Sequence, residues 1–292
     1  KRKERVIMLE NLRFERGEDI NDIRLAKTLA KMGDIFVNES FALTHRSSAS
    51  AVAITKLLPS FAALNLLNEI HYLERSLKPN KPSVALIGGA KIETKLPLIK
   101  NFQKNYDKIL VGGGIANTLL KAKKYDVGGS LIDAEEINKA KTLAKSKKLL
   151  LPVDLVVANK ETKKNVRVVK VGKNKILCSP NEQILDIGPE TIYLFSQYIK
   201  KAATIVWNGP MGLLEIPKFS HGSVALARIM AARSSGKAVG IAGGGETLLA
   251  IHKSKMEKYF DFISTGGGAM LEFLGGKKLP GIKLYPKAEV HQ

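Results

Sequence analysis

A short apolar segment, a glycine turn and an amphipathic segment follow one another five times along this chain. The five occurrences are ALIGGAKIETK (85–95), ILVGGGIANTLL (109–120), TIVWNGPMGLLE (204–215), GIAGGGETLLAI (240–251) and STGGGAMLEF (264–273). Glycine lets the backbone turn sharply where other residues would be strained. Strand, turn and helix in repeated succession predict a parallel sheet that is covered by helices on both faces.

The hydrophobic periodicity places the elements of this α/β fold. We expect strands at 5–11, 34–39, 83–89, 108–113, 154–158, 204–209, 238–244 and 262–267. Helices are expected at 21–31, 94–103, 115–124, 134–146, 189–201, 220–233 and 246–258. Residues 61–77 have apolar positions at helical spacing and are followed by KPNKP, so this helix is the candidate interdomain connector. The end of the chain is rich in proline, glycine and lysine and predicts a tail with little helix.

The glycine turns also predict an anion site. In an open α/β sheet, ligands bind at the carboxyl ends of the strands, where each following helix begins with unpaired N–H groups and a partial positive charge. Any one turn could be an ordinary strand-to-helix connection. Several such turns at one edge of a sheet favour a ligand that carries several phosphates.

The generic phosphate motifs are absent from the sequence. No Gly-Lys pair is followed by Ser or Thr, so there is no Walker A loop. The third glycine of the dinucleotide fingerprint is replaced by Asn117, Leu248 or Leu271 in the three candidate loops. No Cys/His metal spacing and no nucleophilic serine elbow occur. These residues alone therefore predict an α/β protein that binds a multiply phosphorylated ligand.

Charge, cysteine content and hydropathy argue against nucleic-acid-binding, disulfide-stabilised and membrane-spanning proteins. The 47 Lys and Arg residues against 27 Asp and Glu give a net charge of +20. The lysines are scattered over the predicted helices, and aromatic residues make up only 6%, which favours a lysine-rich solvated surface over nucleic-acid binding. Cys178 is the only cysteine, which excludes a disulfide within the chain and fits a reducing compartment. No apolar run is long enough to span a bilayer.

Longer motifs give a more specific result. The segments ALIGGAKIETK, VGGGIANTLL, LDIGPETI, VWNGPMGLLE, IAGGGET and ISTGGGAMLEFLGGKKLPG resemble the phosphoglycerate kinase family and occur in the order that this family has them. MLENLRFERGE, DIFVNESFALTHRSSAS and LLPS, further upstream, are similar to it as well. The resemblance covers essentially the whole chain.

The resemblance implies two doubly wound parallel-sheet (Rossmann-like) domains joined by a helix. It implies reversible, magnesium-dependent phosphoryl transfer between 1,3-bisphosphoglycerate and ADP, giving 3-phosphoglycerate and ATP in glycolysis. A cytoplasmic monomer with small-molecule substrates, and with neither a nucleic acid nor a membrane as partner, is implied as well.

The resemblance also implies that part of the first domain is missing. The family has on the order of a hundred further residues before VIMLENLRF. We therefore expect a fragment in which residues 1–60 are a remnant of the 3-phosphoglycerate-binding domain and residues 61–79 form the connecting helix and linker. Residues 80–275 are then the nucleotide-binding domain, and residues 276–292 are the tail.

Site residues follow from the motifs one by one. The resemblance assigns Lys95 to the transferring phosphoryl group and Lys91 to the nucleotide phosphates. Residues four apart share a helical face, so both lysines could reach one phosphate chain. The other nucleotide-binding residues that it implies are Gly89, Gly113, Gly114, Gly188, Asn208, Pro210, Glu215, Gly244, Gly245, Glu246 and Thr247. Gly245 and Gly268, where two helices begin, are implied to hold the migrating group as catalytic residues, and Trp207 is expected in the core.

On the substrate side, Arg13 and Arg46 match two arginines that grip the anionic substrate, as suits the planar guanidinium fork. His45 is expected to be structural. Glu246 departs from the family, which usually has Asp there to serve the metal–nucleotide complex, and magnesium is strict about geometry. The loop VNESFALTHR also departs, with Ala42 in place of a glycine.

Two other hypotheses stay open at this point. One is a nucleotide-binding fragment without catalysis. The other is a basic α/β protein that binds nucleic acid, which steep salt dependence unaffected by ATP would reveal.

Overall fold

The computed structural model describes residues 6–282 and divides the chain into two compact units. Of the described residues, the first unit holds 6–71 and 277–282, and the second holds Tyr72–Gly276. The boundary falls inside helix α2 (Leu64–Leu77). Residues 283–292 of the predicted tail lie outside the described residues.

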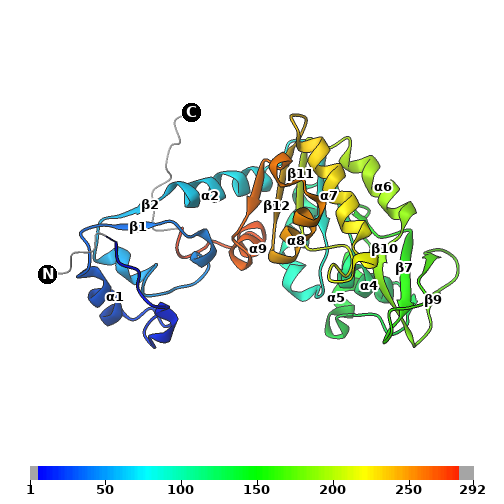
Figure 1. Cartoon of the computed structure of the whole chain (residues 1–292), viewed down its shortest axis with the longest axis horizontal. Coiled ribbons are helices and arrows are strands. Elements are labelled where there is room, and N and C mark those ends of the chain that lie inside the picture. Colours follow the sequence, from blue (N-terminus) through cyan, green and yellow to red (C-terminus); the bar gives the residue numbers. More distant parts are fainter. Residues whose placement is uncertain (1–5, 283–292) are drawn as a thin grey trace. The chain divides into compact units, whose positions relative to one another are not determined.

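The first unit is small and has little regular structure (Figure 1). It contains α1 (Ile23–Ala30), strands β1 (Phe36–Asn38) and β2 (Ser60–Ala62), and the short 3₁₀ turns η1 (Leu12–Phe14), η2 (Phe41–Leu43) and η3 (Ala53–Lys56). The two strands pair in parallel with each other. A buried core cluster of this unit consists of Ala26, Ala49, Ala53 and Ile54. The predicted strand at 5–11 is wrong for residues 6–11, which form no strand. A strand needs a partner to pair with, and Val6 and Met8 are 85% and 94% exposed.

The second unit is built on a six-stranded parallel sheet in the order β13-β12-β11-β3-β4-β6. Its strands are β3 (Ser83–Ile87), β4 (Lys108–Val111), β6 (Leu149–Leu150), β11 (Thr204–Asn208), β12 (Val239–Gly243) and β13 (Phe262–Ser264). Every residue of β3 and β11 is buried, so both faces of the sheet centre are covered. The expected α/β class is therefore confirmed.

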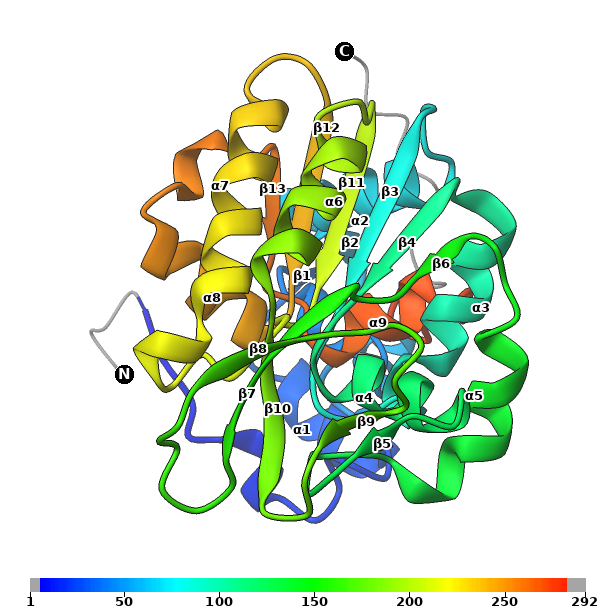
Figure 2. The ribbon, with the colours of Figure 1, turned by 90° about the vertical axis from the view of Figure 1, so that its right-hand side faces the viewer.

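Helices cover the sheet as the strand–helix repeat predicts. They are α3 (Leu96–Asn105), α4 (Gly113–Ala122), α5 (Ile137–Leu143), α6 (Pro189–Ile199), α7 (His221–Ser234), α8 (Gly245–Ser254) and α9 (Gly268–Leu274). Short 3₁₀ turns precede or follow several of them, at η4 (Glu93–Lys95), η5 (Ala134–Glu136), η6 (Pro217–Phe219) and η7 (Glu257–Tyr259). In Figure 2, α6 and α7 lie in front of β11 and β12, and α7 packs between α6 and α8.

A large core cluster joins α6, α7 and α8 to the sheet. It includes Phe195 of α6, Met230 of α7 and Ile251 of α8 against Leu86 and Trp207 of the central strands. Trp207 is fully buried, as predicted, and its Nε1–H donates to the Gly209 carbonyl at 2.8 Å. Within residues 6–282, no helix combines the length and apolarity that crossing a membrane requires.

A further sheet in the second unit is antiparallel, which departs from the expectation that the strands of this unit are parallel. Strand β7 (Asp154–Asn159) lies between β8 (Arg167–Lys170) and β10 (Glu182–Ile187), and β7 pairs antiparallel with both. The polar segment KETKKNV lets the chain double back from β7 into β8. The short strands β5 (Asp126–Val127) and β9 (Ile176–Cys178) form a further parallel pair. An apolar run such as DLVVA predicts a strand but not the direction of its partner.

Candidate nucleotide site

The strand order of the second unit fixes where a ligand can bind. In chain order, the parallel strands read 3-2-1-4-5-6 across the sheet, and the direction of the connections reverses between β3 and β11. The loops after two such strands diverge and leave a crevice at their carboxyl ends. Two adjoining cavities occur at this point, and Gly89, Ala90 and Glu246 line both of them.

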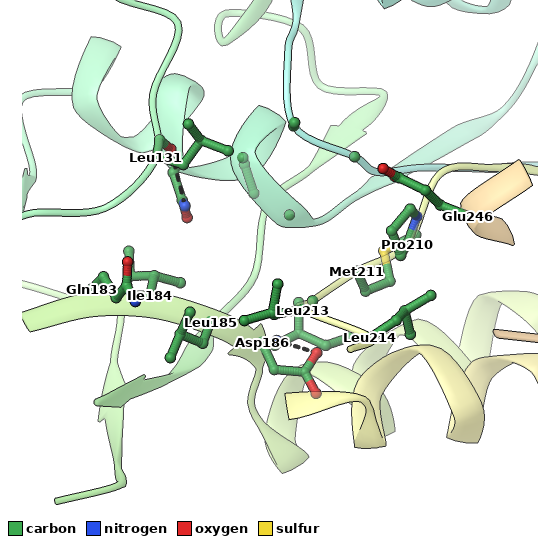
Figure 3. A pocket seen from close by; sticks show the side chains of 18 of the residues that line it. Leu131, Gln183, Ile184, Leu185, Asp186, Pro210, Met211, Leu213, Leu214 and Glu246 are labelled. Atoms are coloured by element: carbon green, nitrogen blue, oxygen red, sulfur yellow. Dashed lines mark hydrogen bonds between the residues drawn. The ribbon is translucent and has the colours of Figure 1, made fainter. Parts of the chain in front are cut away.

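The first cavity, which we call the slot, has a volume of about 310 Å³ and mainly apolar walls. Leu131, Leu155, Leu185, Met211, Leu213 and Leu214 are among its lining residues, together with Pro210 and Glu215. Figure 3 shows Leu131, Gln183 and Ile184 gathered at one end and Glu246 at the other. A flat, apolar group with a polar edge suits such walls.

Close backbone contacts shape the slot. A Cβ on Gly114 would lie 2.3 Å from the Ala90 carbonyl oxygen, so only glycine allows α4 to begin this close to the turn after β3. Gly113 has a φ of +61°, in the left-handed region that favours glycine. Gly89 N–H donates to the Pro210 carbonyl at 2.9 Å, which ties the turns after β3 and β11 together.

The second cavity, which we call the polar cavity, has a volume of about 400 Å³ and is lined by glycine turns and lysines. Its lining includes Lys91, Lys95, Asn208, Gly244, Gly245, Glu246, Thr247 and Gly267. Helix α8 begins at Gly245, and a Cβ there would meet no atom within 4 Å. The first N–H groups of α8 and the two lysines make this cavity suited to an anion.

Lys95 is the partly buried cation of the polar cavity. Its Nζ donates to Asn208 Oδ1, and Asn208 Nδ2 donates in turn to the Gly243 carbonyl at 2.8 Å. Burial lowers the pKa of Lys95 to about 8, and the negative charge of Glu246 opposes that shift. A phosphate in this cavity would meet an ammonium that loses little water on binding.

Thr247 lines the polar cavity and also makes a hydrogen bond that holds the cavity walls together. Its fully buried side-chain oxygen accepts a hydrogen bond from Gly209 N–H at 2.7 Å. This bond joins the first turn of α8 to the turn after β11, so the two walls of the polar cavity hold each other in place.

Asp186 gives the slot wall a buried carboxyl group. It is 2% exposed and accepts hydrogen bonds from Gly222 N–H and Ile187 N–H, both at 2.8 Å. Burial raises the pKa of Asp186 to about 7, against the opposing effect of these two bonds. The group therefore titrates in the neutral range.

Two of the expected site residues, Gly188 of the nucleotide set and the catalytic Gly268, line neither cavity. Gly188 abuts Asp154, and a Cβ there would lie 2.3 Å from the Asp154 carboxyl carbon, so packing against Asp154 accounts for this glycine. Gly268 begins α9, while its neighbour Gly267 lines the polar cavity. All the other expected nucleotide residues line at least one of the two cavities.

The two expected substrate arginines lie in the first unit. Arg13 and Arg46 both face Asp19, at 3.1 Å and 4.0 Å between guanidinium nitrogen and carboxylate oxygen. They are about half exposed, which leaves their charge accessible to an anion. His45 Nδ1 is buried and has no hydrogen-bond partner among the described residues.

Sequence reasoning missed one wall of the slot. Strand β10 contributes the residues 183–187, and helix α4 contributes Asn117. The run ILDI before GPET has the apolar segment, glycine and helix start that predict a strand elsewhere in the chain, although its antiparallel partner could not be inferred from it.

Comparison with known proteins supports one family. The sequence profile of the phosphoglycerate kinase family matches residues 1–277. The chain is 42% identical over 284 residues to phosphoglycerate kinase of Maricaulis maris, which covers 95% of this chain and 70% of that protein. It is 45% identical to the enzyme of Geotalea uraniireducens, with 96% and 70% covered. The solved structure of phosphoglycerate kinase from Coxiella burnetii aligns with a TM-score of 0.84 at 41% identity, covering 94% of this chain and 71% of that one.

Proposed function

The chain belongs to the phosphoglycerate kinase family, whose members are phosphotransferases, and we propose that the two cavities of its second unit hold the nucleotide in the reaction of this family. The reaction moves a phosphoryl group reversibly between 1,3-bisphosphoglycerate and ADP. The observation that carries the proposal is the pairing of an apolar slot with a cationic, glycine-lined cavity at the switch point of the sheet.

The chemistry of the walls orients the nucleotide. The apolar slot takes the adenine base, with Pro210 and the backbone of Gly113 and Gly114 along it, and Glu215 accepts hydrogen bonds from the ribose hydroxyls. The polar cavity takes the phosphates, which then lie against Lys91, Lys95 and the start of α8.

Lys95 stabilises the phosphoryl group in transit. Phosphoryl transfer needs little covalent help from the protein and depends on positive charge around the equatorial oxygens. Lys95 lies in the polar cavity, and its contact with Asn208 keeps the ammonium in place. Gly245 at the start of α8 lines the same cavity, and Gly268 begins α9 next to Gly267, which also lines it, so these two helix starts are the further source of N–H donors.

The oxygen ligands available at this site are of the kind that binds magnesium in a metal–nucleotide complex. Within the described residues, no three His, Cys, Asp or Glu side chains gather to hold a metal ion by themselves. Mg²⁺ commonly binds through one or two carboxylates, substrate phosphates and water. Glu246 lines both cavities and is the carboxylate that would meet a metal–nucleotide complex here. The ion, when bound, neutralises charge on the phosphates.

Residues 1–60 form, in this proposal, part of a 3-phosphoglycerate-binding domain. Arg13 and Arg46 are the anion-binding groups, and their clustering around Asp19 supports a shared role. Val37 and Phe61, on the paired strands β1 and β2, are 49% and 55% exposed, which supports a surface that further structure covers. Residues 61–79 then link this domain to residues 80–275.

The cellular setting follows from the same proposal. A glycolytic enzyme that uses small-molecule substrates would work in the cytoplasm, and we propose that it does so as a monomer without nucleic acid or membrane as partner. The lysine-rich surface is then a solvated surface.

A magnesium titration of ADP binding tests the site. We expect calorimetry to detect magnesium-dependent ADP binding by the wild-type chain. Glu246→Asp should preserve or strengthen the magnesium dependence, because the shorter carboxylate matches the residue usual in the family, and Glu246→Ala should weaken it. Superimposable titrations of the three proteins would reduce Glu246 to a helix-start residue, and no ADP binding at all would contradict the proposed site.

A further inference from the structure

One buried polar atom of the slot makes no hydrogen bond to any described residue. Asn117, on α4, is 3% exposed and lines the slot, and its Oδ1 is buried without any hydrogen bond among the described residues. A buried carbonyl oxygen that makes no hydrogen bond destabilises the protein, because the hydrogen bonds it made to water are not replaced. Because buried polar atoms are usually hydrogen-bonded, such an atom in a ligand cavity is expected to accept a hydrogen bond from the ligand.

The orientation of this amide is set by its other contact. Asn117 Nδ2 donates to the Leu131 carbonyl oxygen at 3.2 Å. A backbone carbonyl can only accept, so the amide nitrogen must face Leu131 and the amide oxygen must be the unpartnered atom. Rotating the amide by half a turn would place two acceptors against each other.

The contact also places the amide along the slot. Leu131 lies with Gln183 and Ile184 at the end opposite Glu246 (Figure 3). Glu246 is shared with the polar cavity, where the proposed function places the phosphates. Asn117 therefore lies at the end of the slot that receives the far edge of the base.

We infer that Asn117 is a specificity-determining residue that recognises the exocyclic amino group of the adenine base. This inference rests on the proposed function. The amino group donates a hydrogen bond to Asn117 Oδ1, while Leu131 holds the amide in the accepting orientation. Hypoxanthine carries a carbonyl at the same ring position, which would set two acceptors against each other.

The test compares the binding of three nucleoside diphosphates by calorimetry, in the presence of magnesium. ADP carries the amino group, purine riboside diphosphate has hydrogen there, and IDP has the carbonyl. We expect the wild-type chain to bind ADP about tenfold more tightly than either analogue, as one buried hydrogen bond allows. In Asn117→Leu, which has a similar volume and no acceptor, the three affinities should become equal.

Asn101→Leu is the matched control. Asn101 Nδ2 likewise donates to a backbone carbonyl, that of Leu274 at 2.7 Å, but Asn101 does not line the slot. This variant should keep the wild-type preference for ADP. Equal affinities in the wild-type chain, or an unchanged preference in Asn117→Leu, would overturn the inference while leaving the proposed function intact. If Asn117→Leu does not fold, the wild-type series decides alone, and failure of every nucleotide to bind would refute the proposed function itself.

Discussion

Lys95 carries its charge in a setting that makes the charge sensitive to pH. Burial lowers its pKa to about 8, so the free site loses this proton as the pH rises through about 8, well below the value near 10.4 of an exposed lysine. Bound phosphate favours the charged form. We therefore expect ADP binding near pH 9 to take up a proton and to weaken as the pH rises further, which calorimetry in buffers of different ionisation enthalpy measures.

Two variants distinguish the contribution of Lys95 to ADP binding and turnover from that of Lys91. Lys95→Met should abolish the proton uptake, and it should lower any kinase turnover far more than ADP affinity, by about 2.7–4 kcal/mol of transition-state stabilisation. Lys91→Met removes an exposed lysine of the same cavity and should weaken binding while retaining the proton uptake. Proton uptake that survives in Lys95→Met would assign the effect to another group.

Asp186 should make stability depend on pH in the opposite sense to most carboxylates. Its pKa is raised to about 7 by burial, whereas an unfolded Asp titrates near 3.9. Between these values only the folded chain keeps the proton, so this group lowers the free energy of unfolding as the pH rises from about 4 to about 7, by on the order of a few kcal/mol. Urea denaturation at pH 5 and pH 8 should show this loss in the wild type and a smaller one in Asp186→Asn.

Single residues of the site were predictable only where a long motif carried them. Lys95 and Gly114 stand in segments whose order along the chain identifies a family. Asn117 and Asp186 also stand in such segments, VGGGIANTLL and LDIGPETI, but the motifs imply no role for them, because an unpartnered oxygen and a raised pKa arise from burial among distant elements. The motif predicts a nucleotide contact for Gly188, and the structure places this glycine against Asp154, outside the lining of the two cavities.

Elements were more predictable than their partners. The parallel strands and their helices follow from the alternation of apolar runs and amphipathic segments, and helix α2 was expected at 61–77 and found at Leu64–Leu77. Strand β7 was expected, but its antiparallel pairing depends on β8 and β10, which were not. The apolar residues 6–11 could not form a strand without a partner.

Two glycines at element ends should respond to alanine in different ways. A Cβ on Gly88, after β3, would lie 1.9 Å from the Pro210 carbonyl oxygen, so Gly88→Ala should force the turns of β3 and β11 apart and cost about 3 kcal/mol or more of stability. Gly245, at the start of α8, has open space, so Gly245→Ala should leave stability unchanged or up to about 1 kcal/mol higher.

The same two variants, Gly88→Ala and Gly245→Ala, distinguish effects on stability from effects on ADP binding. Gly245 lines the polar cavity in which we propose that the phosphates bind, so we expect the added methyl group of Gly245→Ala to hinder their approach to the backbone and to lower ADP affinity by about tenfold or more. Thermal denaturation and ADP calorimetry on both variants measure the two effects. A stable Gly88→Ala protein, or a Gly245→Ala protein with wild-type ADP affinity, would contradict this account of the two turns.

The two units of the whole molecule differ in how well their apolar surface is buried. The second unit encloses large side chains such as Trp207 and Phe195 completely. The first unit has a core cluster whose buried members are three alanines and Ile54, with only partly buried leucines and a phenylalanine packed against them, and a two-stranded sheet that bears exposed Val37 and Phe61. A two-stranded sheet is marginally stable in water without further packing, so the first unit should be the less stable of the two.

This difference leads to a prediction about the chain as a whole. The nucleotide groups lie together in the well-packed second unit, while Arg13 and Arg46 lie in the weakly packed first unit. Catalysis requires that both substrates be held in line, since small misplacements cost large factors in rate. We therefore expect the chain to bind MgADP but to form little or no ATP from 1,3-bisphosphoglycerate. Calorimetry and a coupled ATP assay measure the two properties separately, and Lys95→Met is the control for residual turnover. Robust, Lys95-dependent ATP formation would mean that the first unit, as it stands, already positions the acyl phosphate.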